Sequence, residues 1–236
     1  MTEEYGLIKK TKPPFPVKEL IRVPHKKGGL ISGLFGKNSF HNNVDELIKT
    51  YSHPLTEEPI FFREPTTAES ISFAAYEFGS KGDVDAKRDI FDPAWLQLGR
   101  IIRNSEGVFT NITIKDDDQL KELLGSAEKI NGIWIIDENT AFAPYETFNH
   151  GVQDYKDFAR GGLAKSLEHT RGKFAPKLRK MASPKNYKEG VNVFGFNPTK
   201  KPIQKVAGLI SDGDGGRLYV DGDWDGDDGF AFGVLE

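Results

Sequence analysis

The stretch from residue 60 to residue 136 constrains the fold most, because its helix start and stop signals agree with its apolar spacing. Thr66 and Glu69 form a capping box, in which a hydroxyl and a carboxylate each satisfy a free backbone N–H at a helix start. Apolar residues at helical spacing follow, and Gly79 ends the pattern. The sequence therefore predicts a helix from 66 to 79 that buries Ile71, Ala74, Ala75 and Phe78.

A second helix is predicted from 92 to 104. Asp92 followed by Pro93 is typical of a helix start, since proline at the first helical position loses no hydrogen bond. Its apolar stripe consists of Trp95, Leu98, Ile101 and Ile102. After a turn at 104–107, the β-branched residues of 108–114 predict a strand.

A third helix is predicted from 116 to 131. Three successive acids, Asp116 to Asp118, favour a helix N-terminus, and Asn131 with Gly132 favours a left-handed stop. The residues at helical spacing between these signals are Leu120, Leu123, Leu124, Ala127 and Ile130.

The order of these signals resembles the tail assembly chaperones of long-tailed bacteriophages. In such proteins an extended Arg-Glu-Pro-Thr segment leads into a helix, and a passage with Glu-Gly, Phe-Thr, Asp-Asp and Leu precedes a helix ending in Asn-Gly. The matching residues here are Arg63 to Thr66, Glu106 and Gly107, Phe109 and Thr110, Asp116 to Asp118 with Leu120, and Asn131 with Gly132. The resemblance implies a helical domain that coats the tape-measure protein and a C-terminal part that recruits tail-tube subunits.

Beyond residue 190 the apolar period changes to two, which predicts short strands at 191–196, 206–210, 217–220 and 230–235. Asn-Pro and Asp-Gly turns between them predict a small antiparallel sheet. The turn at 221–229 begins like a calcium-binding EF-hand loop, with Asp221, Asp223 and Asp225 at positions one, three and five. Position twelve is Phe232 instead of a glutamate, so a weak Ca²⁺ site and a solvated acidic hairpin both remain open.

Charge alternates along the chain although the net charge is only −3. Residues 1–40 are basic, 41–155 acidic, 156–210 basic and 211–236 acidic. With the helical signals, this pattern predicts an α+β protein: an N-terminal arm (1–40), a helical middle domain (41–150), a basic connector (151–190) and a small antiparallel β-rich region with an acidic hairpin (191–236).

The basic segment 156–188 interleaves cations with aromatic residues, which is typical of a surface that contacts phosphates. The alternative is a solvated segment neutralised by the acidic middle domain or a sister subunit. The residues predicted to contact nucleic acid or a partner are Arg160, Lys165, Arg171, Lys173, Lys177, Arg179 and Lys180. Within the segment, Gly161 and Gly162 would interrupt a helical face.

The sequence lacks the residues or motifs that several kinds of functional site require. The chain contains no cysteine, which excludes disulfides, thiolate zinc sites and cysteine nucleophiles. The glycine-rich segment 28–37 departs from the phosphate-loop pattern, because Ile31 replaces a required glycine and Asn38 the Ser or Thr. The five histidines are scattered, without metal-ligand spacing. No apolar run approaches 18 residues, so no membrane-spanning segment is expected.

The sequence thus predicts a non-enzymatic assembly or interaction protein, without a cofactor unless the Ca²⁺ interpretation holds. If the resemblance holds, the protein is a tail assembly chaperone in the host cytoplasm, and its partners are phage tail proteins or sister subunits. The alternative is a virion structural protein of tail, neck or capsid. A third interpretation is a nucleic-acid-binding protein that uses residues 156–188.

Overall fold

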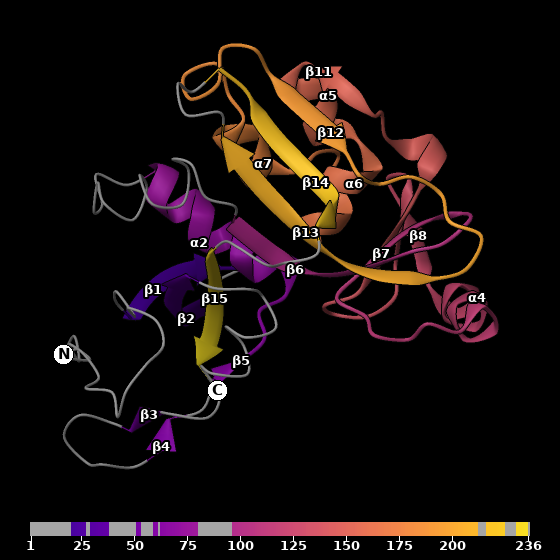
Figure 1. Cartoon of the computed structure of the whole chain (residues 1–236), viewed down its shortest axis with the longest axis horizontal. Helices are drawn as coiled ribbons and strands as arrows, with labels where there is room; N and C mark the ends of the chain where they lie inside the picture. Colours follow the sequence, from indigo (N-terminus) through magenta and orange to yellow (C-terminus); the bar gives the residue numbers. More distant parts are fainter. Residues whose placement is uncertain are drawn as a thin grey trace.

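The computed structural model describes residues 20–26, 29–37, 51–52, 59–60, 62–79, 96–211, 216–224 and 230–235, and this part of the chain is mostly β (Figure 1). One mixed sheet contains 13 strands. They are β1 (Leu20–His25), β2 (Gly29–Lys37), β5 (Phe62–Arg63), β6 (Leu96–Arg103), β7 (Gly107–Thr110), β8 (Glu128–Ile130), β9 (Ile133–Ile135), β10 (Ala141–Pro144), β11 (Gly151–Gln153), β12 (Val191–Phe194), β13 (Ile203–Ser211), β14 (Leu218–Trp224) and β15 (Phe230–Leu235).

The strands branch at β6. The main path runs β11-β12-β14-β13-β6-β7-β10-β9-β8, and β15 leaves it by pairing with the start of β6, with β2 and with β5. Strand β1 completes this branch as the partner of β2. Most pairs are antiparallel, whereas β12–β14 and β15–β6 are parallel. A separate pair is formed by β3 (Tyr51–Ser52) and β4 (Pro59–Ile60).

The helices of the described part are short. They are α2 (Thr67–Gly79), α4 (Asp117–Ser126), α5 (Tyr155–Arg160), α6 (Gly162–Leu167) and α7 (Pro176–Met181), with a 3-10 turn at Tyr145–Thr147. The predicted helix at 66–79 is confirmed, and Ile71 and Ala74 on its predicted face are fully buried. The predicted break in the basic segment is confirmed as well. Gly162 follows the gap between α5 and α6, where an added Cβ would lie 1.9 Å from Thr147 Oγ1.

The predicted α+β class with a helical middle domain is wrong, and the first reason is β6. Residues 96–103, predicted as a helix, form a central strand in which Leu98, Ile101 and Ile102 are fully buried. The sequence of a strand that is buried on both faces is a nearly continuous apolar run. Such a run also contains apolar residues at helical spacing, so the pattern is compatible with a helix. Residues 92–95 of that prediction lie outside the described residues.

The second reason is the Asn131-Gly132 pair. Helix α4 begins at the predicted place, where the Asp116 carboxylate accepts hydrogen bonds from Asp118 N and Gln119 N at 3.1 and 2.9 Å. The helix ends at Ser126, five positions earlier than predicted, and Glu128–Ile130 is a strand. Asn131 and Gly132 have φ values of 50° and 86° and join β8 to β9 as a tight hairpin turn. The pair that can stop a helix therefore turns a hairpin here.

The predicted arm and C-terminal region also differ from the structure. Strands β1 and β2 form a hairpin that enters the sheet through β15, so residues 20–25 and 29–37 are not an arm. The four C-terminal strands exist, but they are not a separate antiparallel sheet, and β14 and β15 pair with other strands instead of with each other. Strands from all four predicted segments share one sheet, while the boundaries at 40, 150 and 190 stay predictions. The helix predicted at 43–51 lies outside the described residues, except Tyr51 in β3.

Apolar residues alternate between two cores on opposite faces of β6, β7 and β10. On one face Ile101, Val108 and Ala143 join a large core that includes buried residues of α2, α6 and α7. On the other face Ile102 lies opposite Phe109 in the β6–β7 pair, and Phe109 lies opposite Phe142 in the β7–β10 pair. The ring centroids of Phe109 and Phe142 are 4.4 Å apart. Leu120 of α4 covers this second core.

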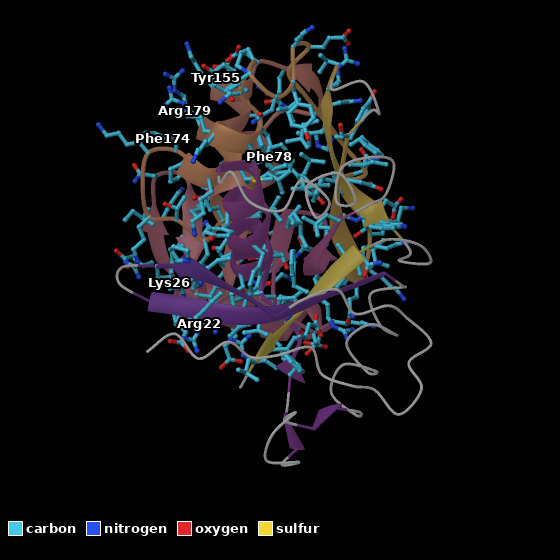
Figure 2. All side chains as sticks on the ribbon, turned by 90° about the vertical axis from the view of Figure 1, so that its left-hand side faces the viewer. Arg22, Lys26, Phe78, Tyr155, Phe174 and Arg179 are labelled. Atoms are coloured by element: carbon cyan, nitrogen blue, oxygen red, sulfur yellow. The ribbon has the colours of Figure 1, made fainter. Side chains whose placement is uncertain are left out.

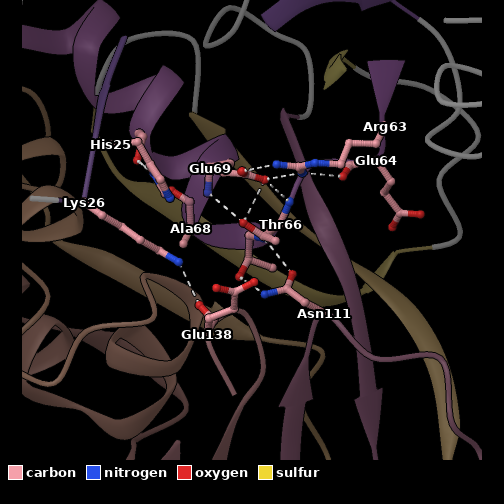
Figure 3. A network of polar contacts seen from close by, with 11 residues as sticks. His25, Lys26, Arg63, Glu64, Thr66, Ala68, Glu69, Asn111 and Glu138 are labelled. Carbon is pink, nitrogen blue, oxygen red and sulfur yellow. Dashed lines mark hydrogen bonds and ion pairs between the residues drawn. The ribbon is translucent and has the colours of Figure 1, made fainter. Parts of the chain in front are cut away.

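Polar contacts fix the start of α2 where four segments of the chain meet (Figure 3). Glu69 accepts hydrogen bonds from Arg63 Nη1 and Nη2 at 2.8 and 2.6 Å and from Thr66 N at 2.8 Å. Asn111 Oδ1, at the end of β7, accepts from Thr67 N at 2.7 Å. Thr67 Oγ1 donates to Leu167 O of α6 at 2.7 Å. The capping box is thus confirmed. Its Glu69 also joins α2 to β5, and the neighbouring Thr67 joins α2 to Asn111, just after β7, and to α6.

Replacing Leu120 with Ala should lower the free energy of unfolding by about 2–5 kcal/mol, because the fully buried side chain leaves a cavity above Phe109 and Phe142. Leu124→Ala in the same helix is the matched control and should cost less, since Leu124 is only partly buried. Urea unfolding of both variants measures the difference. Equal losses would show that the second core is not centred on Leu120.

Candidate functional site

Four cationic side chains and one aromatic ring line a pocket of about 420 Å³ between α5 and α7. We call this pocket the basic groove; its lining residues are Lys156, Arg160, Lys173, Phe174 and Arg179. As far as the described part of the chain goes, no carboxylate lines it. The groove is therefore a candidate site for an anionic partner.

Short helices with one buried face each place the lining residues. Asp154 caps α5 by accepting from Lys156 N at 2.7 Å, and Phe158 and Ala159 anchor the helix in the core. Lys156 and Arg160, four residues apart, consequently project from the exposed face. In α7 the buried Leu178 leaves Arg179 at the rim, and Ala175 N donates to Ala159 O at 2.8 Å, which holds the preceding Lys173 and Phe174 beside α5.

The cations of the groove interact mainly with aromatic rings. The Arg179 guanidinium lies 4.8 Å from the centroid of Phe174, and Lys156 Nζ lies 5.6 Å from that of Tyr155. Figure 2 shows Tyr155, Phe174 and Arg179 gathered at one edge of the molecule. Arg160 has an ion pair with Asp157 at 3.6 Å, but both side chains are more than 60% exposed, so the pair contributes little. Most of the positive charge thus remains available to a ligand.

The structure brings together only part of the predicted contact surface. Arg160, Lys173 and Arg179 line the groove, and Lys180 is exposed outside its lining. Lys165 is buried and donates to Asn131 O, and its burial lowers its pKa. Arg171 pairs with Glu128, and Lys177 Nζ donates to Ser72 Oγ at 2.6 Å. These three cations have contacts within the protein.

The predicted contact residues do not include Lys156 and Phe174, although both belong to the basic segment in which cations alternate with aromatic residues. The spacing of Lys156 and Arg160 on one face of a capped helix could have indicated the first. The position of Phe174, two residues before the proline that starts α7, gives no such signal, because it depends on how the loop packs against α5.

The aspartates of the predicted Ca²⁺ site lie in and beyond β14. Asp221 is buried, and its carboxylate accepts from Asp223 N at 2.9 Å. Asp223 pairs with Arg103 at 2.6 Å and with Lys205 at 3.3 Å, and Asp225 lies outside the described residues. Within the described ranges no group of three metal-ligating side chains is assembled, and the Ca²⁺ site stays a prediction.

A larger cavity of about 810 Å³ lies beside α2, and several of its polar side chains have partners within the protein. On its wall Lys177 approaches Ser72, and His25 Nδ1 lies 2.8 Å from the same hydroxyl. A serine paired with a lysine can be a nucleophile and its base. Here Ser72 is 2% exposed and donates to Ala68 O at 2.7 Å, so its one donor and two acceptor positions are filled. This network holds β1, α2 and α7 together.

Burial also changes the ionisation of the groups around the cavity. It lowers the pKa of His25 to about 4, with a further contribution from the nearby Lys177 charge. It raises the pKa of Glu168 to about 7, although the carboxylate accepts hydrogen bonds from Leu178 N and Lys177 N at the start of α7. His25 is therefore neutral near pH 7, which suits a proton on Nδ1 donated to Ser72 Oγ.

The chain matches no protein-family model, no curated protein and no solved structure. Among the residues that the structure describes, none of the helices has the length and apolar character needed to cross a membrane.

His25 should contribute a fall in the free energy of unfolding on acidification from pH 6.5 towards pH 4. Its pKa is lower in the folded state, so the unfolded chain binds the proton more readily and unfolding is favoured in this range. Glu168 acts oppositely, because its raised pKa makes the folded state take up a proton between about pH 4.5 and 7.

The variant His25→Asn separates the two effects, since its amide can still donate to Ser72 but does not titrate. Urea unfolding at several pH values between 4 and 7 should show that the variant gains stability relative to the original protein as the pH falls. The same pH dependence in both would mean that His25 is not the group held neutral by the fold.

Proposed function

We propose that the protein is a non-enzymatic assembly or interaction protein that binds a polyanionic partner through the basic groove. The observation that carries this proposal is the convergence of four cationic side chains on one pocket without a lining carboxylate. A concave surface of one charge sign raises the local concentration of a partner of opposite charge. This local field matters more than the net charge of −3, which is spread over the whole chain.

The assembly role that we put first is that of a phage tail assembly chaperone in the host cytoplasm, with tail proteins as partners. The alternating charge blocks support a role in joining charged partners. The resemblance motif itself adds little to the binding surface. Arg63 binds Glu69, Glu64 accepts from Arg100 Nε at 2.7 and 2.8 Å, and Thr66 caps α2. A polyanionic partner is therefore expected at the groove and not at the motif.

The alternative of a virion structural protein differs in where the chain is found. An assembly chaperone should be absent from purified particles, whereas a structural component should be present in stoichiometric amount. Mass spectrometry of particles from the virus that encodes the chain distinguishes the two. Neither result decides whether the groove binds a polyanion, which the heparin experiment below tests.

The groove proposal predicts retention on immobilised heparin, a polyanion, that depends on the groove. The double variant Arg160→Glu with Lys173→Glu should elute at clearly lower salt, because both exposed side chains line the groove. The matched control is Lys200→Glu with Lys201→Glu, which makes the same charge change at exposed residues outside the groove. The control should elute close to the original protein.

Equal shifts of the two double variants would mean that retention follows total charge, and the proposal would fail. Thermal unfolding of each variant checks that the fold is retained. The exposed positions of all four side chains make a loss of folding an unexpected result.

A further inference from the structure

We infer that the polyanion held by the basic groove is a single-stranded nucleic acid, with one base stacked on Phe174 and adjacent phosphates bound by the surrounding lysines and arginines. This inference rests on the proposed function, since it names the partner class of the same groove. Its central observation is an aromatic ring that stays 38% exposed among four cations.

Phe174 is held in place without being covered. Its backbone lies next to Ala175, whose N–H is bonded to Ala159 O at 2.8 Å, and its ring contacts the Arg179 guanidinium. An exposed ring backed by arginine can stack with an unpaired base, and such stacking tolerates any base because every base has a π face. The cost of exposing the ring to water in the free protein would be offset on binding.

The ring favours a nucleic acid over an acidic protein segment. Carboxylates of a peptide would neutralise Lys156, Arg160 and Lys173 but would leave Phe174 without a stacking partner. Phosphates and bases alternate along a nucleic acid, so a single ligand supplies an anion to the cations and a flat ring to Phe174. In a duplex the base faces are stacked on one another, which makes the single strand the form that fits.

The number of cations limits the salt dependence of binding. Lys165, Arg171 and Lys177 have contacts within the protein, and Lys180 lies outside the groove lining, so we assign the phosphate contacts to the four cations of the groove. For a single strand, the logarithm of the binding constant should then fall with the logarithm of salt concentration with a slope of about −3. If all seven cations predicted from the sequence bound phosphates, the slope would be about −5.

The test measures how tightly the full chain binds two fluorescent probes. One is an oligothymidylate of twelve nucleotides, and the other is a polyglutamate peptide of twelve residues. Phe174→Leu removes the π face and keeps apolar bulk, and should weaken oligothymidylate binding about tenfold while leaving polyglutamate binding unchanged. Phe194→Leu is the matched control, because Phe194 is similarly exposed at 37% but does not line the groove. It should bind both probes as the original protein does.

Four results would overturn the inference. If polyglutamate binds and oligothymidylate does not, the partner is an acidic protein segment and the proposed function stands. If Phe174→Leu binds oligothymidylate as tightly as the original protein, or a duplex of equal length binds equally well, the stacking of an unpaired base is excluded. If neither probe binds at low salt, the proposed function fails together with the inference.

Discussion

The attachment of helix α2 at its N-terminus is the contact on which the rest of the structure depends. The carboxylate of Glu69 is almost fully buried, and burial alone would raise its pKa. Hydrogen bonds from Arg63 and Thr66 outweigh that effect and lower the pKa, so the charge is retained inside the protein. Because Thr67 forms hydrogen bonds with Asn111 and with Leu167, the first turn of α2 also joins the sheet to α6. A loss at this point would separate the elements that form the large core.

Local signals in the sequence were reliable where one backbone geometry satisfies them, and failed where two do. The capping box at Thr66 and Glu69 permits only a helix start, and it was predicted correctly. The stripe of Leu98, Ile101 and Ile102 fits both a helix and a strand buried on two faces, and the sheet partners β7 and β13 decide between them. Strand β7 follows β6 after a short turn, but β13 is distant in sequence, so no local pattern shows that β6 lies between two strands.

The candidate groove was predictable in part for a related reason. Lysine and arginine were easy to assign to a basic surface, but the sequence does not show which of them the fold uses for itself. Lys165 and Lys177 point into the protein, where carbonyl and hydroxyl groups accept their hydrogen bonds. Arg160, whose ion-pair partner Asp157 is itself exposed, and Lys173 stay at the surface. Long cationic side chains can serve either purpose, and tertiary packing selects one.

The position of β15 in the sheet has a consequence for how the chain folds during synthesis. This strand is made after all the others described, yet it pairs with β2 near the other end of the chain, and its Phe232 ring stacks on Phe73 of α2 at 4.5 Å. The hairpin of β1 and β2 therefore lacks its sheet partner until β15 has been synthesised. Contacts of such long sequence separation make folding slow and leave strand edges unpaired in the meantime. A nascent chain of this protein is consequently most exposed to aggregation before β15 is available to pair.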